Sequence, residues 1–83
     1  MKLLYFASIR QKIGIGEEDF SLPANVETVE ALVNVLCSRG RSYAEALNGA
    51  SQLHCAVNQV HAAFSASIKP DDEVAFFPPV TGG

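Results

Sequence analysis

The strongest pattern in the sequence is a helical one near the middle of the chain. Apolar residues recur there at the i, i+3, i+4 and i+7 spacing that places side chains on one face of an α-helix; they are Val29, Leu32, Val33 and Leu36. Thr28 precedes them and suits the N-cap, and Arg39 and Gly40 follow as end signals. The pattern predicts one main helix with a single buried stripe.

Strand-like segments flank this helix on both sides. The predicted strands cover residues 2–8, 17–22, 53–58, 60–63 and 73–77. The first segment lacks polar alternation, which is typical of a strand buried on both faces. Residues 9–16, with two glycines, predict a short helical turn and a loop, and residues 42–47 predict a further short helix.

The order of these elements predicts an α+β fold with a mixed sheet of four to five strands. Segments 2–8 and 73–77 are the most uniformly apolar, so we expect them side by side and parallel at the centre, with the main helix over one face. This is the β-grasp arrangement of ubiquitin. We expect a domain over residues 1–77 and an extended tail over 78–83, because Pro78 and Pro79 cannot continue a strand.

Composition narrows the class of protein. The chain has 83 residues, of which 48% are apolar, enough for one small globular domain. Its net charge is −3 and its six basic residues are scattered, which argues against nucleic-acid binding. The apolar run at residues 3–7 is too short for a membrane span or a signal-peptide core. Because Cys37 and Cys55 form no CxxC motif, we expect a cytoplasmic protein with reduced thiols and no membrane partner.

The tail carries the chemistry that we expect to be central. Pro78 and Pro79 favour an extended course, so residues 78–83 can reach about 20 Å at roughly 3.3–3.6 Å per residue. Gly82 and Gly83 remove both side chains next to the terminal carboxylate, which lets the backbone enter a narrow channel. Two terminal glycines occur by chance in roughly 0.5% of chains. Because they follow the last predicted strand on a proline-stiffened tail, a functional role explains them better than chance.

The sequence resembles the small subunits of molybdopterin synthase in the ubiquitin-like sulfur-carrier family. The matching residues span the whole length; they are 4–7 (LYFA), Arg10, Thr28, Val29, Leu32, 56–58 (AVN) and 72–83 (DEVAFFPPVTGG). The resemblance implies that an activating enzyme adenylates Gly83 with ATP and that sulfur then replaces AMP, giving a thiocarboxylate. It also implies that the tail, including Val80 and Thr81, delivers this sulfur to a pterin precursor in molybdenum cofactor biosynthesis.

The resemblance further implies the partners. A larger catalytic subunit would receive the tail in a 2:2 heterotetramer, so the chain would not be an enzyme on its own. No cofactor would be bound permanently, because ATP is used by the activating enzyme. Phe6 and Phe77 would contact the large subunit, together with His61, which stands where an aliphatic residue is common in the family.

Strand alternation gives an independent argument for the two phenylalanines. It places Leu3, Tyr5, Val74 and Phe76 toward the helix. Phe6 and Phe77 then face away from the only long predicted helix, and two outward aromatics need cover that a partner would provide. Packing of both rings in the core is an alternative of comparable weight in so small a chain.

The other chemistry-bearing residues predict no second site. His54, Cys55 and His61 make a poor metal set, because adjacent strand residues point to opposite faces, and we interpret both histidines as surface residues. Cys37 lies near the apolar stripe and is interpreted as a packed thiol. The acidic runs 17–19 and 71–73 are interpreted as solvated charges, with contact to a basic activating enzyme as the alternative.

Three other functions stay open on the sequence alone. A sulfur carrier of the thiamine pathway shares the fold and the Gly-Gly end, although the ending 76–80 (FFPPV) favours the molybdopterin branch. A ubiquitin-like modifier would link Gly83 to a lysine of a target protein. A β-grasp interaction module with an inert tail would keep its activity without Gly82 and Gly83.

Overall fold

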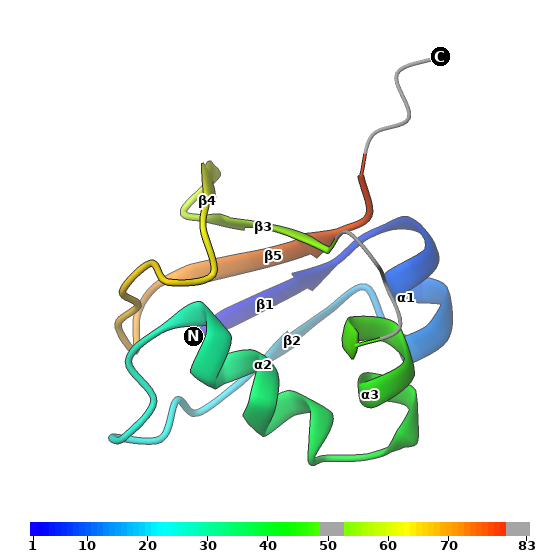
Figure 1. Ribbon diagram of the computed structural model, residues 1–83, viewed down its shortest axis with the longest axis horizontal. Coiled ribbons are helices and arrows are strands. Elements are labelled where there is room, and N and C mark those ends of the chain that lie inside the picture. The colour runs from blue at the N-terminus through cyan, green and yellow to red at the C-terminus, as the bar shows by residue number, and fades with distance from the viewer. Residues whose placement is uncertain (49–52, 80–83) are drawn as a thin grey trace.

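The computed structural model describes residues 1–48 and 53–79, which form one sheet and three helices (Figure 1). The strands are β1 (Lys2–Tyr5), β2 (Glu17–Asp19), β3 (His54–Val57), β4 (Val60–Ala62) and β5 (Glu73–Phe77). The helices are α1 (Ala7–Ile13), α2 (Val29–Cys37) and α3 (Arg41–Asn48). None of these three helices has the length and apolar composition needed to cross a membrane.

The first and last strands meet at the centre of the sheet. The strand order is β2-β1-β5-β3-β4, and β1 pairs with β5 in parallel, with Leu3 beside Val74 and Tyr5 beside Phe76. The remaining pairs are antiparallel. The structure thus confirms the predicted α+β class, the mixed sheet and the ubiquitin-like β-grasp arrangement.

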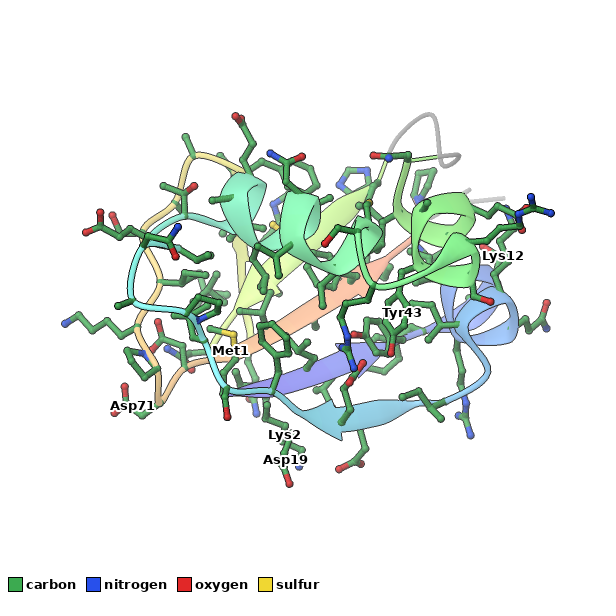
Figure 2. The ribbon with its side chains drawn as sticks, turned by 90° about the horizontal axis from the view of Figure 1, so that it is seen from below. Met1, Lys2, Lys12, Asp19, Tyr43 and Asp71 are labelled. Atoms are coloured by element: carbon green, nitrogen blue, oxygen red, sulfur yellow. The ribbon has the colours of Figure 1, made fainter. Side chains whose placement is uncertain are left out.

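One face of the sheet is buried beneath α2 and α3, which lie together on that side in both views (Figures 1 and 2). The inward residues of the central strands are fully buried, as alternation predicts: Leu3, Tyr5, Val74 and Phe76. The predicted stripe of α2 packs into the same core, with Val29, Leu32, Val33 and Leu36 buried. Thr28 caps α2, because its Oγ1 accepts a hydrogen bond from the Ala31 N–H at 3.2 Å.

The prediction of a strand over residues 2–8, buried on both faces, is wrong in two respects. β1 ends at Tyr5, and Ala7 adopts a φ of 51° as the chain turns into α1. Lys2 is exposed and Leu4 is half-buried, so only one face of β1 lies in the core. The apolar residues of β1 therefore lie on two different faces. One face is buried in the core, and no described helix covers the other.

Two further predicted segments differ in extent. α1 is longer than the short helical turn predicted within residues 9–16. Ile9 anchors the helix in the core and Gly14 ends it. Gly14 has a φ of 97°, a conformation that favours glycine, and its N–H donates to the Arg10 carbonyl at 2.8 Å. β2 stops at Asp19 rather than at residue 22. The main helix is accordingly joined by two shorter ones, α1 and α3.

Asn58 ties the β3–β4 hairpin to the turn before β5. The two-residue loop of this hairpin has positive φ at both positions, as its geometry requires. Asn58 Nδ2 donates to Asp72 Oδ1 at 3.0 Å, and Asn58 Oδ1 accepts from the Glu73 N–H at 2.9 Å. Asp72 Oδ2 also accepts from the Lys69 N–H at 2.8 Å. Asp72 therefore fastens this turn through hydrogen bonds that are themselves exposed at the surface.

Glu18 is the polar centre of the helix side of the molecule. Its Oε2 accepts hydrogen bonds from the hydroxyls of Tyr5 and Tyr43 at 2.7 and 2.8 Å, and its Oε1 accepts from Arg39 Nη1 at 2.9 Å. Tyr43 reaches from α3 over the strands in Figure 2. The Arg39 guanidinium also lies 4.8 Å from the Tyr43 ring centroid. One carboxylate thus joins β2, β1, α3 and the end of α2.

The electrostatics of this cluster favour the ionised carboxylate. Burial alone would raise the pKa of Glu18, but the hydrogen bonds from Tyr5, Tyr43 and Arg39 outweigh it and hold that pKa below its ordinary value of 4.5. Burial, and then the hydrogen bond to Glu18, raises the pKa of the Tyr5 hydroxyl far above its usual range. The interpretation of run 17–19 as solvated charge is wrong for Glu18, which serves as a structural acceptor.

We expect Glu18→Gln to lower the free energy of unfolding by about 1–3 kcal/mol, because the hydroxyls of the buried Tyr5 and the half-buried Tyr43 lose a charged acceptor. Urea unfolding followed by circular dichroism measures this change. Glu17→Gln is the matched control from the same strand: its 3.5 Å ion pair with Lys2 is exposed, so its removal costs about 0–1 kcal/mol. Equal effects of the two substitutions would contradict the role given to Glu18.

The Glu18 contribution should also depend on pH. The folded state holds the Glu18 pKa below 4.5, so the unfolded chain takes up the proton first as the pH falls. The stabilisation is therefore complete above the ordinary carboxyl range and is lost as the pH falls through the folded pKa. We expect the stability gap between the parent protein and Glu18→Gln to narrow below about pH 4. A gap that stays constant from pH 7 to pH 3 would contradict this assignment.

Candidate functional site

The face of the sheet opposite α2 and α3 is the candidate functional surface, and we call it the open face. Alternation and the strand registers assign to it Leu4, Phe6, His54, Ala56, His61, Ala75 and Phe77. In Figure 1 the helices α2 and α3 lie on the other side of the strands. The open face therefore combines apolar side chains from β1 and β5 with two histidines from β3 and β4.

Phe6 and Phe77 lie at the end of the sheet where the tail begins. Phe6 continues β1 in extended conformation, with φ of −125° and ψ of 154°, and its N–H donates to the Phe76 carbonyl at 3.2 Å. Continuing the register places Phe6 alongside Phe77. Phe6 is 48% exposed and Phe77 is half-buried. The structure thus places both rings where alternation predicted them, while their role in partner binding stays a prediction.

Both histidines reach the open face and meet beside Phe77. His54 Nδ1 lies 3.0 Å from His61 Nε2, so one ring nitrogen donates a hydrogen bond to the other. The His54 ring stacks on Phe77 with centroids 5.9 Å apart, and the His61 ring meets Phe77 edge-on at 6.1 Å. Sequence reasoning identified His61 for this surface but missed that His54 joins it. Their meeting across two strands depends on the register of the β3–β4 hairpin.

The cysteines do not join this surface. Cys55 is fully buried on the opposite face, and its Sγ donates to the Ala62 carbonyl at 3.2 Å. Burial raises the pKa of the Cys55 and Cys37 thiols, which disfavours the nucleophilic thiolate form. Within residues 1–48 and 53–79, no three His, Cys, Asp or Glu side chains gather as a metal site. Cys55 therefore does not join His54 and His61 in a metal set.

A shallow groove of about 470 Å³ adjoins Phe6. Ile15, which is 42% exposed, lines it with Arg10 and Leu4. A Cβ at Gly16 would lie 3.1 Å from the Arg10 guanidinium carbon, a close contact that a small shift of the exposed Arg10 side chain would relieve. Sequence reasoning missed Ile15, although a lone apolar residue between two glycines was a usable signal. The groove therefore adjoins the open face at Leu4 and Phe6, with both apolar and charged residues in its lining.

The tail leaves the sheet directly from β5. β5 ends at Phe77, and Pro78 and Pro79 follow as half-buried residues outside the strand. The predicted reactive residues Gly82 and Gly83, and their neighbours Val80 and Thr81, lie outside the described residues. The structure shows where the chain leaves β5, which is at the same end of the sheet as Phe6.

Comparison with known proteins gives one consistent result. The sequence model of the ThiS family matches residues 3–83. The molybdopterin synthase sulfur carrier subunit of Escherichia coli (strain K12) is 40% identical over 83 residues, covering 100% of this chain and 99% of the relative. The protein of that name from Haemophilus influenzae is 38% identical over 87 residues, with coverages of 100% and 99%.

The fold also matches a solved structure. The crystal structure of SAMP1 from Haloferax volcanii superposes with a TM-score of 0.79, at 23% sequence identity and with 100% and 98% of the two chains covered. At this identity the likeness establishes the fold alone.

Proposed function

The chain belongs to the ThiS family, and from this premise we propose that it is the sulfur carrier subunit of a molybdopterin synthase, with the carboxylate of Gly83 as its working group. The observation that carries the proposal is the likeness to curated sulfur carrier subunits over the whole length of both chains. The Gly-Gly end and the departure of the tail from the central strand support it.

The proposed chemistry begins with activation of the terminal carboxylate. A Gly83 carboxylate oxygen attacks the α-phosphorus of ATP on an adenylating enzyme, forming an acyl-adenylate and releasing pyrophosphate. A sulfur nucleophile then attacks the acyl carbon, and AMP leaves with the electron pair of the broken C–O bond. With the hydrosulfide anion or its equivalent as the nucleophile, the product is a thiocarboxylate. Its sulfur then bonds to a pterin precursor, and water attacks the acyl carbon to break the C–S bond and restore the Gly83 carboxylate. Gly82 and Gly83 leave both faces of this carbon open to the incoming groups.

In this proposal the chain is a tethered reactant rather than an enzyme. The adenylating enzyme and the large subunit supply the acid–base and electrostatic work, while this chain supplies orientation. No resident cofactor is needed, because ATP is consumed at the adenylating enzyme. Pro78 and Pro79 would direct the tail into a channel of the partner. We expect this to take place in the cytoplasm.

We further propose that the open face docks on the large catalytic subunit in a 2:2 assembly. Two observations support this surface: Phe6 is exposed on a face that α2 and α3 do not cover, and it lies beside the strand that feeds the tail. Aromatic residues at the centre of an interface commonly carry most of its binding energy. Phe6 and Phe77 are the proposed anchors, and His61 is the polar contact beside them.

The first test of the proposal is the intact mass of the protein purified from cells that contain its adenylating enzyme. We expect a species heavier by about 16 Da, which tandem fragmentation assigns to the C-terminal residue; this assignment separates it from a single oxidation elsewhere. A variant without Gly82 and Gly83 is the control and should lack the species. If Gly83 is instead found in isopeptide bonds to lysines of other proteins, the chain is a modifier and the proposal is wrong.

The docking surface can be tested by substitution. We expect Phe6→Ala to weaken binding of the large subunit at least tenfold, as measured by isothermal titration calorimetry, because it removes an exposed anchor worth about 2 kcal/mol or more.

Val60→Ala is the matched control for this experiment. Val60 is more exposed than Phe6, at 67%, but strand alternation places it on the face that Ala62 shares, away from the open face. Its truncation should leave the affinity unchanged. If Phe6→Ala binds as the parent protein does, the docking face has been assigned wrongly, whatever the outcome of the mass measurement.

A further inference from the structure

We propose that His54 and His61 form a bidentate site for one divalent transition-metal ion, of the class of Ni²⁺ and Cu²⁺, on the open face of the sheet. The inference goes beyond the sulfur-carrier function: the proposed chemistry at Gly83 uses neither side chain, and His61 is shared with the proposed docking surface. It revises the expectation that both are ordinary surface histidines.

The strand register brings the two rings together. His61 on β4 lies opposite Ala56 on β3, and His54 is two residues before Ala56 on the same face. The two histidines are therefore diagonal cross-strand neighbours, an arrangement in which long side chains can meet. The rings do meet, with centroids 5.3 Å apart and His54 Nδ1 at 3.0 Å from His61 Nε2.

The nitrogen separation suits a shared metal ion. Two nitrogens bound to one ion at about 2.0–2.1 Å lie about 2.9–3.4 Å apart for bond angles between roughly 90° and 109°. The observed 3.0 Å falls at the near-right-angle end of this range, which square-planar and octahedral ions adopt. Binding requires the donating ring to move its proton to its other nitrogen, and both rings to turn so that their two lone pairs converge on the ion. No electron transfer is involved.

Phe77 restrains both imidazoles before an ion arrives. The His54 ring is nearly parallel to Phe77, at 14°, and the His61 ring meets it at 63°. Rings held by packing lose less conformational freedom on binding, which strengthens a chelate. The all-nitrogen donor set selects the transition-metal class over Mg²⁺ and Ca²⁺, which prefer oxygen. Because both histidines are accessible at the surface, water can complete the coordination.

The composition of the chain makes the proposal easy to test. The chain has two histidines, so every imidazole signal in its NMR spectrum reports on this pair. We expect Ni²⁺ to bind the full-length protein with one ion per chain and to broaden both imidazole signals at the same midpoint, while Mg²⁺ leaves them unchanged. Amide broadening should centre on β3, β4 and Phe77.

Substitutions separate a chelate from two independent ligands. His54→Gln and His61→Gln should each weaken Ni²⁺ binding about tenfold or more, because the second ligand binds at high effective concentration. Cys37→Ser is the matched control and should bind as the parent protein does. The proposal would be overturned if the parent protein bound two Ni²⁺ ions with separate titration midpoints. It would also be overturned if the remaining histidine of either variant kept the midpoint of the parent protein. Amide broadening in the parent protein centred away from β3 and β4 would overturn it without reference to any variant.

Discussion

The parallel pairing of β1 with β5 is the constraint on which the rest of the molecule depends. It joins the first and last strands at the centre of the sheet, with Leu3 beside Val74 and Tyr5 beside Phe76. Parallel neighbours need a long crossover between them, and here the intervening chain supplies α2 and α3 as the cover of one face. Both strands run in the same direction toward α1 (Figure 1), so the tail begins next to Phe6.

The same pairing fixes which residues are available for function. Because side chains alternate along a strand, a slip of one residue would exchange the buried and open faces. In the observed register the larger inward residues fill the core, and Phe6, Phe77 and the two histidines remain on the open face. Core packing and the proposed docking surface are therefore specified by one pattern. A mutation that shifts the register would damage both at once.

The sequence predicted what local patterns determine. The stripe of α2 and its Thr28 cap follow from spacing of three and four residues, and β5 follows from an apolar run closed by prolines. The sequence predicted only a short helical turn where α1 forms, because the full length of α1 depends on Ile9 reaching a core built by distant segments. The roles of Glu18 and His54 were missed for a related reason. Their partners are 13 to 25 residues away for Glu18 and seven for His54, across a register that no local pattern encodes.

The direction of β5 has a mechanical consequence. The chain enters β1 at one end of the sheet and leaves β5 at the other, because the two strands are parallel neighbours. A pull on the tail against the N-terminus therefore loads the hydrogen bonds between these strands in shear, all of them together, rather than opening them one by one. Under the proposed function, a pull of a partner on the C-terminus would therefore act in the direction in which the central strand pair resists separation best.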